Sequence, residues 1–201
     1  MNSHDLLAGA RLQGVGVDPA APLPATLIAE LRTDHAGETG AVMIYRGILA
    51  TARDDGVRRF SQRHLATEES HLAGIDPLLA PRDRSRLLPL WRAAGWLTGA
   101  LPALAGPRAV YATIEAVETF VDQHYAEQID SIEALDPRRI QPRLQALRAL
   151  LQNCRADEVE HRDEAAALFA TGGPPPSLAL RIWVWSVGHG SSVAVKICRR
   201  V

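Results

Sequence analysis

Apolar residues along most of the chain recur at spacings of three and four, the period of an α-helix with one face turned towards a core. Strict alternation of apolar and polar residues, which would indicate β-strands, is almost absent. Asp-Gly, prolines and paired glycines separate the periodic stretches. The pattern therefore predicts four long amphipathic helices, at about residues 26–53, 57–79, 107–135 and 138–170.

Two further segments are the longest uncharged stretches of the chain and are mostly apolar. Residues 93–107 and 182–195 contain no Asp, Glu, Lys or Arg, but each is shorter than the roughly 20 apolar residues that cross a bilayer. All four tryptophans lie in or beside them, and basic residues flank both, which is typical of segments lying among lipid headgroups. Ordinary core helices are the alternative. The tryptophans are Trp91, Trp96, Trp183 and Trp185.

Together these elements predict an all-α protein. We expect a four-helix bundle with one long crossover between its second and third helices. Two additional apolar helices, at about 87–104 and 177–199, would be membrane-associated. An N-terminal lead-in, proline-rich at residues 19–24, would occupy residues 1–25, and residues 26–201 would form a single domain.

Composition narrows the class of protein. Of the 201 residues, 47% are hydrophobic and 22% charged, which is ordinary for a globular protein. A net charge of -1 provides no positive field for nucleic acid, so we expect no nucleic-acid partner. Two cysteines cannot form a disulfide framework. The N-terminal residues match neither a secretory signal nor a transit peptide.

Glutamates interrupt the apolar face of every long helix. Carboxylates are almost never fully buried unless they are paired or bind metal, so four of them in one core require a cation. Two of the glutamates begin Glu-x-x-His motifs, whose spacing puts both side chains on one helical face. The inward residues are Glu38, Glu68, His71, Glu118, Glu158 and His161.

A single Glu-x-x-His motif is weak evidence, but its repetition here is specific. Two motifs on alternate helices, each preceded by a helix with a lone inward glutamate, form the ligand set of ferritin-like two-metal bundles. Four carboxylates balance two divalent cations, and oxygen ligands with two imidazoles suit iron or manganese. A weak internal repeat agrees, since Tyr45 follows Glu38 at the spacing with which Tyr125 follows Glu118. Cys154 reads as a small core residue.

Several segments resemble motifs of the demethoxyubiquinone hydroxylases, a ferritin-like group of di-iron monooxygenases in ubiquinone biosynthesis. The resemblance extends from about residue 27 to the C-terminus and includes the start of the family's membrane-associated insertion. One departure is Thr39, where the family usually has tyrosine, and it affects one contact in the substrate pocket. The matching segments are 31–41, 44–47, 88–91, 116–118, 124–128 and 157–161.

The resemblance implies that the six inward residues bind two iron ions. Glu68 and Glu158 would pair with the histidines of their own helices, while Glu38 and Glu118 would bridge or cap the irons. His124 and Tyr125 would be catalytic, near the entering quinone ring, although an exposed or structural role for His124 is the alternative.

Residues beside the ligands are expected to support them. Metal-bound histidines usually donate their second N–H group to a carboxylate. Asp157, directly before Glu158, and Asp34, one turn before Glu38, are the candidates for this role. His35 is an alternative to Asp34 as a polar neighbour of the site. His64 is expected either to pack in the core or to support a ligand.

The implied reaction is 3-hydroxylation of a prenylated demethoxybenzoquinol, 3-demethoxyubiquinol. The cofactors would be two iron ions (Fe2+/Fe3+), with O2 as co-substrate and an external reductant. One oxygen atom would enter the ring and the other would leave as water. A lipid substrate implies a peripheral protein on the cytoplasmic face of a bacterial inner membrane. The resemblance leaves open other ubiquinone-biosynthesis proteins as partners, and an oligomer.

Three other classes of protein remain alternatives. A ferritin-like iron-storage protein or ferroxidase would use the same ligands but would have no use for interfacial tryptophans. A di-iron hydroxylase of tRNA would need a basic face, which the net charge of -1 does not supply. A purely structural bundle would leave the buried glutamates without a counter-charge.

Overall fold

The computed structural model describes residues 23–171 and 173–201, and all regular secondary structure within them is helical. The expected all-α class is therefore confirmed. The expected lead-in lies, apart from residues 23–25, outside the described residues. The helices are α2 (Ala25–Thr51), α3 (Asp55–Ile75), α4 (Leu88–Ala105), α5 (Pro107–Leu135), α6 (Pro142–Ala170) and α7 (Leu178–Cys198), with 3-10 turns η1 (Asp76–Leu78) and η2 (Pro81–Asp83).

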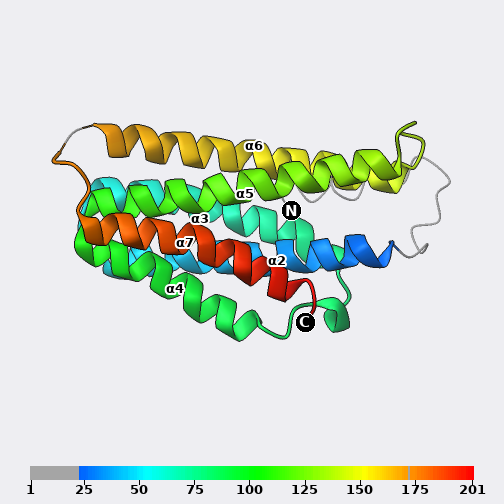
Figure 1. Ribbon diagram of the computed structural model, residues 1–201, viewed down its shortest axis with the longest axis horizontal. Helices are drawn as coiled ribbons and strands as arrows, with labels where there is room; N and C mark the ends of the chain where they lie inside the picture. Colours follow the sequence, from blue (N-terminus) through cyan, green and yellow to red (C-terminus); the bar gives the residue numbers. More distant parts are fainter. Residues whose placement is uncertain (1–22, 172) are drawn as a thin grey trace, which may run out of the picture.

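The helices pack as two pairs with a cover on one side (Figure 1). α2 packs along α3, and α5 packs along α6; contacts between α3 and α6 join the pairs. α4 runs along α2 and also contacts α5, while α7 runs along α5 and also contacts α2. The two apolar helices therefore cover the side of the bundle that α2 and α5 form.

Two helix ends differ from the sequence pattern for local reasons. α3 ends at Ile75, before the expected residue 79, because Pro77 has no N–H to donate and the chain continues as a 3-10 turn. α6 begins at Pro142 rather than near residue 138. The Asp136 carboxylate accepts two backbone N–H groups of the preceding turn, at 3.0 Å each, and proline then takes the first helical position.

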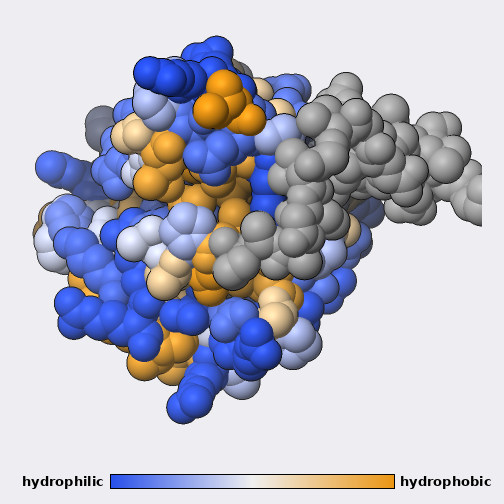
Figure 2. All heavy atoms as spheres, turned by 90° about the vertical axis from the view of Figure 1, so that its right-hand side faces the viewer, coloured by the Kyte–Doolittle hydropathy of each residue, from blue (hydrophilic) through white to orange (hydrophobic). Residues whose placement is uncertain are grey.

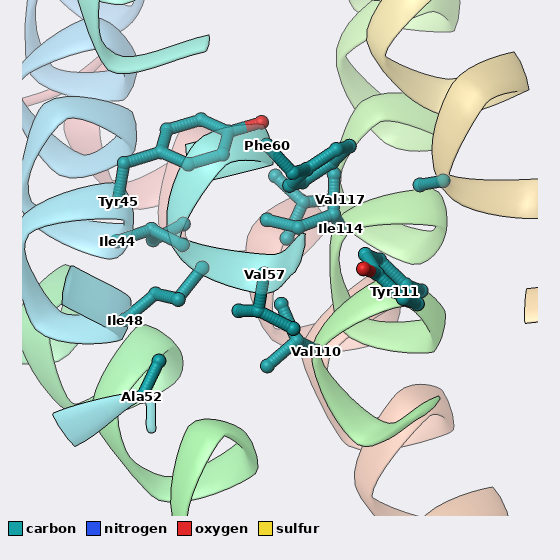
Figure 3. Close-up of a cluster of buried hydrophobic side chains, with 11 residues drawn as sticks. Ile44, Tyr45, Ile48, Ala52, Val57, Phe60, Val110, Tyr111, Ile114 and Val117 are labelled. Carbon is teal, nitrogen blue, oxygen red and sulfur yellow. The ribbon is translucent and has the colours of Figure 1, made fainter. Parts of the chain in front are cut away.

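Buried apolar side chains form two clusters. The first fills the space between α2, α3 and α5, where Ile48, Phe60 and Ile114 point towards one another (Figure 3). The second joins the other ends of α2 and α5 to α6, and it includes Cys154, the expected small core residue. Tyr45 belongs to the first cluster and Tyr125 to the second. The hydroxyl groups of both tyrosines donate to buried glutamates, which are described below.

Several large apolar side chains are exposed on α4 and α7. Within the described residues, no helix is both long and apolar enough to cross a membrane. Figure 2 views the molecule from the end where α2 begins, and hydrophobic residues are also visible there between hydrophilic ones. The exposed apolar residues of α4 and α7 are Leu90, Trp96, Leu97, Leu101, Leu104, Leu178, Ile182, Trp185, Val193 and Ile197.

Glycines allow α2 and α4 to approach closely. A Cβ atom on Gly99 would lie 1.9 Å from the carbonyl oxygen of Ile44, and one on Gly95 would lie 2.4 Å from that of Gly40. Both contacts are with backbone of the neighbouring helix, so a flexible side chain cannot relieve them. Any larger residue at these positions must push the helices apart.

We predict that Gly99→Ala destabilises the protein by at least about 1–3 kcal/mol, because the added methyl group overlaps the α2 backbone. Chemical denaturation would measure this. The control is Gly188→Ala on α7, where nothing lies within 4 Å of the added atom; alanine there should raise stability by up to about 1 kcal/mol through its better helix propensity. Equal stabilities for the two variants would contradict the close approach.

Candidate metal centre

The six inward residues expected from the sequence meet in the middle of the bundle. Every one of them is 5% exposed or less. Their possible ligand atoms fall into two groups, and the atoms of each group lie within 4.8 Å of one another. One group is Glu38, Glu68, His71 and Glu158, and the other is Glu68, Glu118, Glu158 and His161.

The two groups share Glu68 and Glu158, so these two residues would contribute ligands to both metal positions if each group held a cation. His71 Nδ1 lies 3.1 Å from Glu158 Oε1 but 3.8 Å from Glu68 Oε2. His161 Nδ1 lies 3.1 Å from Glu68 Oε1 and 3.4 Å from Glu158 Oε2, so each histidine approaches the glutamate of the opposite motif more closely than its own. Glu38 and Glu118 each face one position, which favours capping over the bridging role also considered for them.

The chemistry of these atoms fits divalent cations. Buried acceptors that lack a donor typically cost about 1–3 kcal/mol each, and here they face one another in one small space. Two cations would supply the missing partners. Oxygen and imidazole donors without thiolate suit iron or manganese. The atoms of the cluster that have no hydrogen-bond partner among the described residues are Glu38 Oε2, Glu68 Oε1 and Oε2, His71 Nδ1, Glu158 Oε2 and His161 Nδ1.

Burial and mutual repulsion shift the pKa values of the cluster. Burial raises the pKa of Glu38 to about 8 and raises that of Glu118 well above its ordinary value, with the charges of Glu158 and Glu68 adding to the second shift. For Glu68 the two nearby histidines outweigh burial and lower the pKa to about 2. For His161 the neighbouring carboxylates outweigh burial and raise the pKa to about 9. Without metal, the cluster therefore retains protons that cations would displace.

Two tyrosines hold the glutamates of opposite halves of the chain. Tyr45 donates to Glu118 Oε1 over 3.3 Å, and Tyr125 donates to Glu38 Oε1. The weak internal repeat in the sequence thus corresponds to two reciprocal hydrogen bonds, in which the tyrosine of each of α2 and α5 binds the glutamate of the other helix. Burial, together with the adjacent carboxylate, raises the pKa of both phenols well above its ordinary value, so both remain donors. Each bond orients a carboxylate at one metal position.

The candidate supporting residues lie in different surroundings. Asp157 Oδ2 is 3.0 Å from His71 Nε2, the position expected for a carboxylate that orients a ligand histidine. Asp34 is not brought to either histidine of the cluster. Its Oδ1 atom lies 3.2 Å from His124 Nε2 and accepts from Gln128 Nε2 over 2.6 Å.

The other two histidines considered from the sequence also have definite partners. His35 Nε2 lies 2.8 Å from Asp76 Oδ1, so His35 connects α2 to the turn after α3. The ring of His64 stands edge-on to that of His161, with centroids 3.9 Å apart, and its Nε2 lies 2.8 Å from Glu164 Oε2. His64 is thus the histidine that packs against a candidate ligand.

An apolar pocket of about 800 Å³ adjoins the cluster. Its wall includes Glu38, Glu118 and Glu158, which are buried, and it also includes Trp185, which is 61% exposed. The pocket therefore extends from the carboxylates to the molecular surface. Besides Glu158 of α6, the wall consists mainly of residues of α2, α4, α5 and α7, so the two apolar helices complete it.

Both residues expected to be catalytic lie in this wall. His124 and Tyr125 line the pocket, and the ring of His124 stacks on Phe120 at a centroid distance of 5.9 Å. Trp91 and Trp183 also line it, a location that composition alone did not indicate. Thr39 is not among the residues that line this pocket. Its hydroxyl group donates to the backbone oxygen of His35.

The sequence did not predict one set of polar side chains that contact one another beside the pocket. Thr33 Oγ1 and Gln128 Nε2 each lie 3.0 Å from His124 Nε2, beside Asp34. Thr33, Asp34 and Gln128 are at most 3% exposed, so this is a buried polar cluster that joins α2 to α5. The spacing of four between His124 and Gln128 puts them on one face and could have suggested their contact.

The described part of the chain is a bundle of helices with buried carboxylates and histidines in two overlapping groups, which is the ligand composition of helical bundles that bind two metal ions. More specifically, the chain belongs to the family described as ubiquinone biosynthesis protein COQ7, whose model matches residues 25–198. The resemblance noted in the sequence is thereby confirmed.

Named relatives agree with this family. A 3-demethoxyubiquinol 3-hydroxylase of Rhodospirillum rubrum is 38% identical over 91% of this chain and 82% of its own length. A mitochondrial NADPH-dependent 3-demethoxyubiquinone 3-hydroxylase of Mus musculus is 34% identical over 85% of this chain and 76% of its own length. A protein of the same name from Caenorhabditis elegans is 29% identical over 90% of this chain and 94% of its own length.

We predict that the metal-free protein loses stability between about pH 6 and about pH 9. The raised pKa values of Glu38, to about 8, and of His161, to about 9, mean that the folded state keeps protons which the unfolded chain has released. Raising the pH removes this advantage. Metal ligands must be deprotonated, so metal binding should strengthen over the same range.

Thermal unfolding of protein treated with a chelator, and of protein loaded with Mn2+ or with Fe2+ under anaerobic conditions, would test this pH dependence. The midpoint should fall with pH in the first sample, and the stabilisation added by metal should grow. Parallel pH profiles for the metal-free and metal-loaded samples would contradict the assignment of the cluster as a metal site.

Proposed function

We propose that this chain is a di-iron monooxygenase that hydroxylates a prenylated demethoxybenzoquinol, in the reaction named for its relatives: 3-hydroxylation of 3-demethoxyubiquinol. One observation carries the proposal. Three carboxylates of the candidate metal cluster form part of the wall of the apolar pocket. An aromatic head group in that pocket would lie against the cluster, with an apolar tail directed to the surface.

The proposal includes a ferritin-like arrangement of α2, α3, α5 and α6, within one domain over residues 26–201. The six buried residues would hold two iron ions, and iron supplies the redox chemistry that the activation of O2 requires. The two Glu-x-x-His motifs on α3 and α6, with lone glutamates on α2 and α5, support this arrangement.

The residues of the chain would then have separable tasks. Apolar residues of α4 and α7 exclude water from the pocket and orient the ring. Tyr125 holds Glu38 through its hydroxyl group, while its position in the wall brings it to the substrate. His124 is fixed by its stacking on Phe120 and by the polar cluster around it. The iron-storage alternative uses the same ligands but assigns no task to this pocket.

We predict that the chain restores ubiquinone synthesis in cells that lack this hydroxylation and accumulate the demethoxyquinone. Glu118→Ala and Glu158→Ala should abolish turnover and lower the iron content, because each removes a charge that faces a metal position. Asp157→Asn should retain most of the iron but lower activity by about 10–100-fold, since it changes only the contact to His71 Nε2.

The measurements are extraction of cellular quinones and metal analysis of each purified protein. Full iron content in both glutamate variants would remove the metal assignment. Persistent demethoxyquinone despite abundant, iron-loaded protein of unchanged sequence would remove the substrate instead and favour iron storage.

We also propose that α4 and α7 rest on a membrane surface, as a peripheral protein on the cytoplasmic face of a bacterial inner membrane. The support is the set of exposed apolar side chains on both helices, among them Leu97, Leu101 and Ile182, which are 47%, 47% and 56% exposed. Because the pocket is lined by the same two helices, this orientation would let a lipid enter without crossing water.

We predict that the triple variant Leu97→Gln, Leu101→Gln, Ile182→Gln binds vesicles of phosphatidylethanolamine and phosphatidylglycerol at least about tenfold more weakly, since each buried leucine or isoleucine contributes about 1.5–3 kcal/mol. Flotation with the vesicles would measure binding. A control is Leu135→Gln with Ile140→Gln, which are 46% and 72% exposed at the junction of α5 and α6. Equal loss of binding in both proteins would contradict the proposed orientation.

A further inference from the structure

Asp34 lies in the wall of the largely apolar pocket and is not one of the candidate metal ligands. It is 3% exposed, and its two carboxylate oxygens have different surroundings. Oδ1 accepts from Gln128 Nε2 over 2.6 Å and lies 3.2 Å from His124 Nε2. Oδ2 is buried and has no hydrogen-bond partner among the described residues.

The neighbouring hydrogen-bond donors bind other acceptors. Gln128 Nε2 also donates to Glu30 Oε2 over 3.3 Å, so both of its hydrogens are used. The opposite orientation of this amide would place two oxygens 2.6 Å apart, next to Asp34 Oδ1. The Thr33 hydroxyl group donates to the Glu30 backbone oxygen over 2.7 Å. Among residues 23–171 and 173–201, Asp34 Oδ2 therefore has no hydrogen-bond donor.

A buried carboxylate oxygen without a donor is costly, and a ligand that brings a donor gains what the protein lacks. An ionised carboxylate accepts hydrogen bonds and cannot donate them. A benzoquinol presents two O–H donors. The corresponding quinone presents only carbonyl oxygens, and one of these beside a carboxylate would be repelled.

We propose that Asp34 is a specificity residue that makes the pocket select the reduced quinol over the oxidised quinone. The inference rests on the proposed function and deepens it, because it assigns the choice of redox form to one side chain. A quinol O–H group donates to Asp34 Oδ2, while Gln128 and His124 hold the carboxylate through Oδ1. The ring is thereby anchored one helical turn from Glu38.

Binding can be tested without turnover by anaerobic equilibrium dialysis of the full chain. The probes are a demethoxybenzoquinol with a two-isoprene tail, its quinone, and the dimethyl ether of the quinol, which has no O–H group. The protein should bind the quinol about tenfold to hundredfold more tightly than the quinone, as expected for a hydrogen bond to a charged group. The dimethyl ether should bind as weakly as the quinone.

Asp34→Asn is the decisive variant. The amide oxygen of asparagine can still accept from Gln128, while its NH2 group takes the place of Oδ2 and turns an acceptor into a donor. The preference should disappear or reverse in favour of the quinone. Asp163→Asn makes the same chemical change at a side chain that is 64% exposed, and it should keep the original preference.

The outcomes separate the two levels of the proposal. Equal affinity of the unchanged protein for quinol and quinone, or an unaltered preference in folded Asp34→Asn, would overturn the role of Asp34 and leave the function standing. If Asp34→Asn does not fold, the dimethyl ether decides, since binding as tight as that of the quinol would overturn the inference. Binding of neither redox form would overturn both the inference and the proposed function.

Discussion

Four carboxylates and two imidazoles buried within one bundle constitute the constraint on which the rest of the structure depends. Six of their oxygen and nitrogen atoms have no hydrogen-bond partner among the described residues, so the arrangement is costly unless cations occupy the space between them. Residues around the cluster restrain it rather than neutralise it. Tyr45 and Tyr125 each hold a glutamate of the opposite half of the chain, and Asp157 meets His71 from outside.

The two apolar helices connect this centre to the surface. Close packing of α4 on α2 at glycines brings one wall of the pocket near the carboxylates, and α7 supplies another. The same helices expose apolar side chains outward. The same two helices can thus shape the inner pocket and present an apolar outer face, so the proposed membrane contact would lie next to the route by which substrate enters.

Much of this could be predicted from the sequence because helical periodicity is local. The spacing of three within Glu-x-x-His, and the position of each glutamate within an apolar stripe, select the six cluster residues without knowledge of the tertiary structure. The adjacency of Asp157 to Glu158 likewise suggested a carboxylate beside a ligand histidine, and the structure shows that this histidine is His71 of the other motif. Helix ends followed the pattern less well, because Pro77 and the Asp136 turn act through particular hydrogen bonds that periodicity does not contain.

By itself, then, the sequence determined the all-α class, the family and the set of buried carboxylates and histidines, since each depends on residues close together in the chain or on a recognisable motif. Tertiary structure alone decided which residues meet across helices. Glu68 and Glu158 are shared between the two groups, Asp34 turns to Gln128 rather than to a cluster histidine, and Trp91 and Trp183 line the pocket. These relations depend on how α2, α4, α5 and α7 pack, and packing between distant segments is not encoded in the period of any one helix.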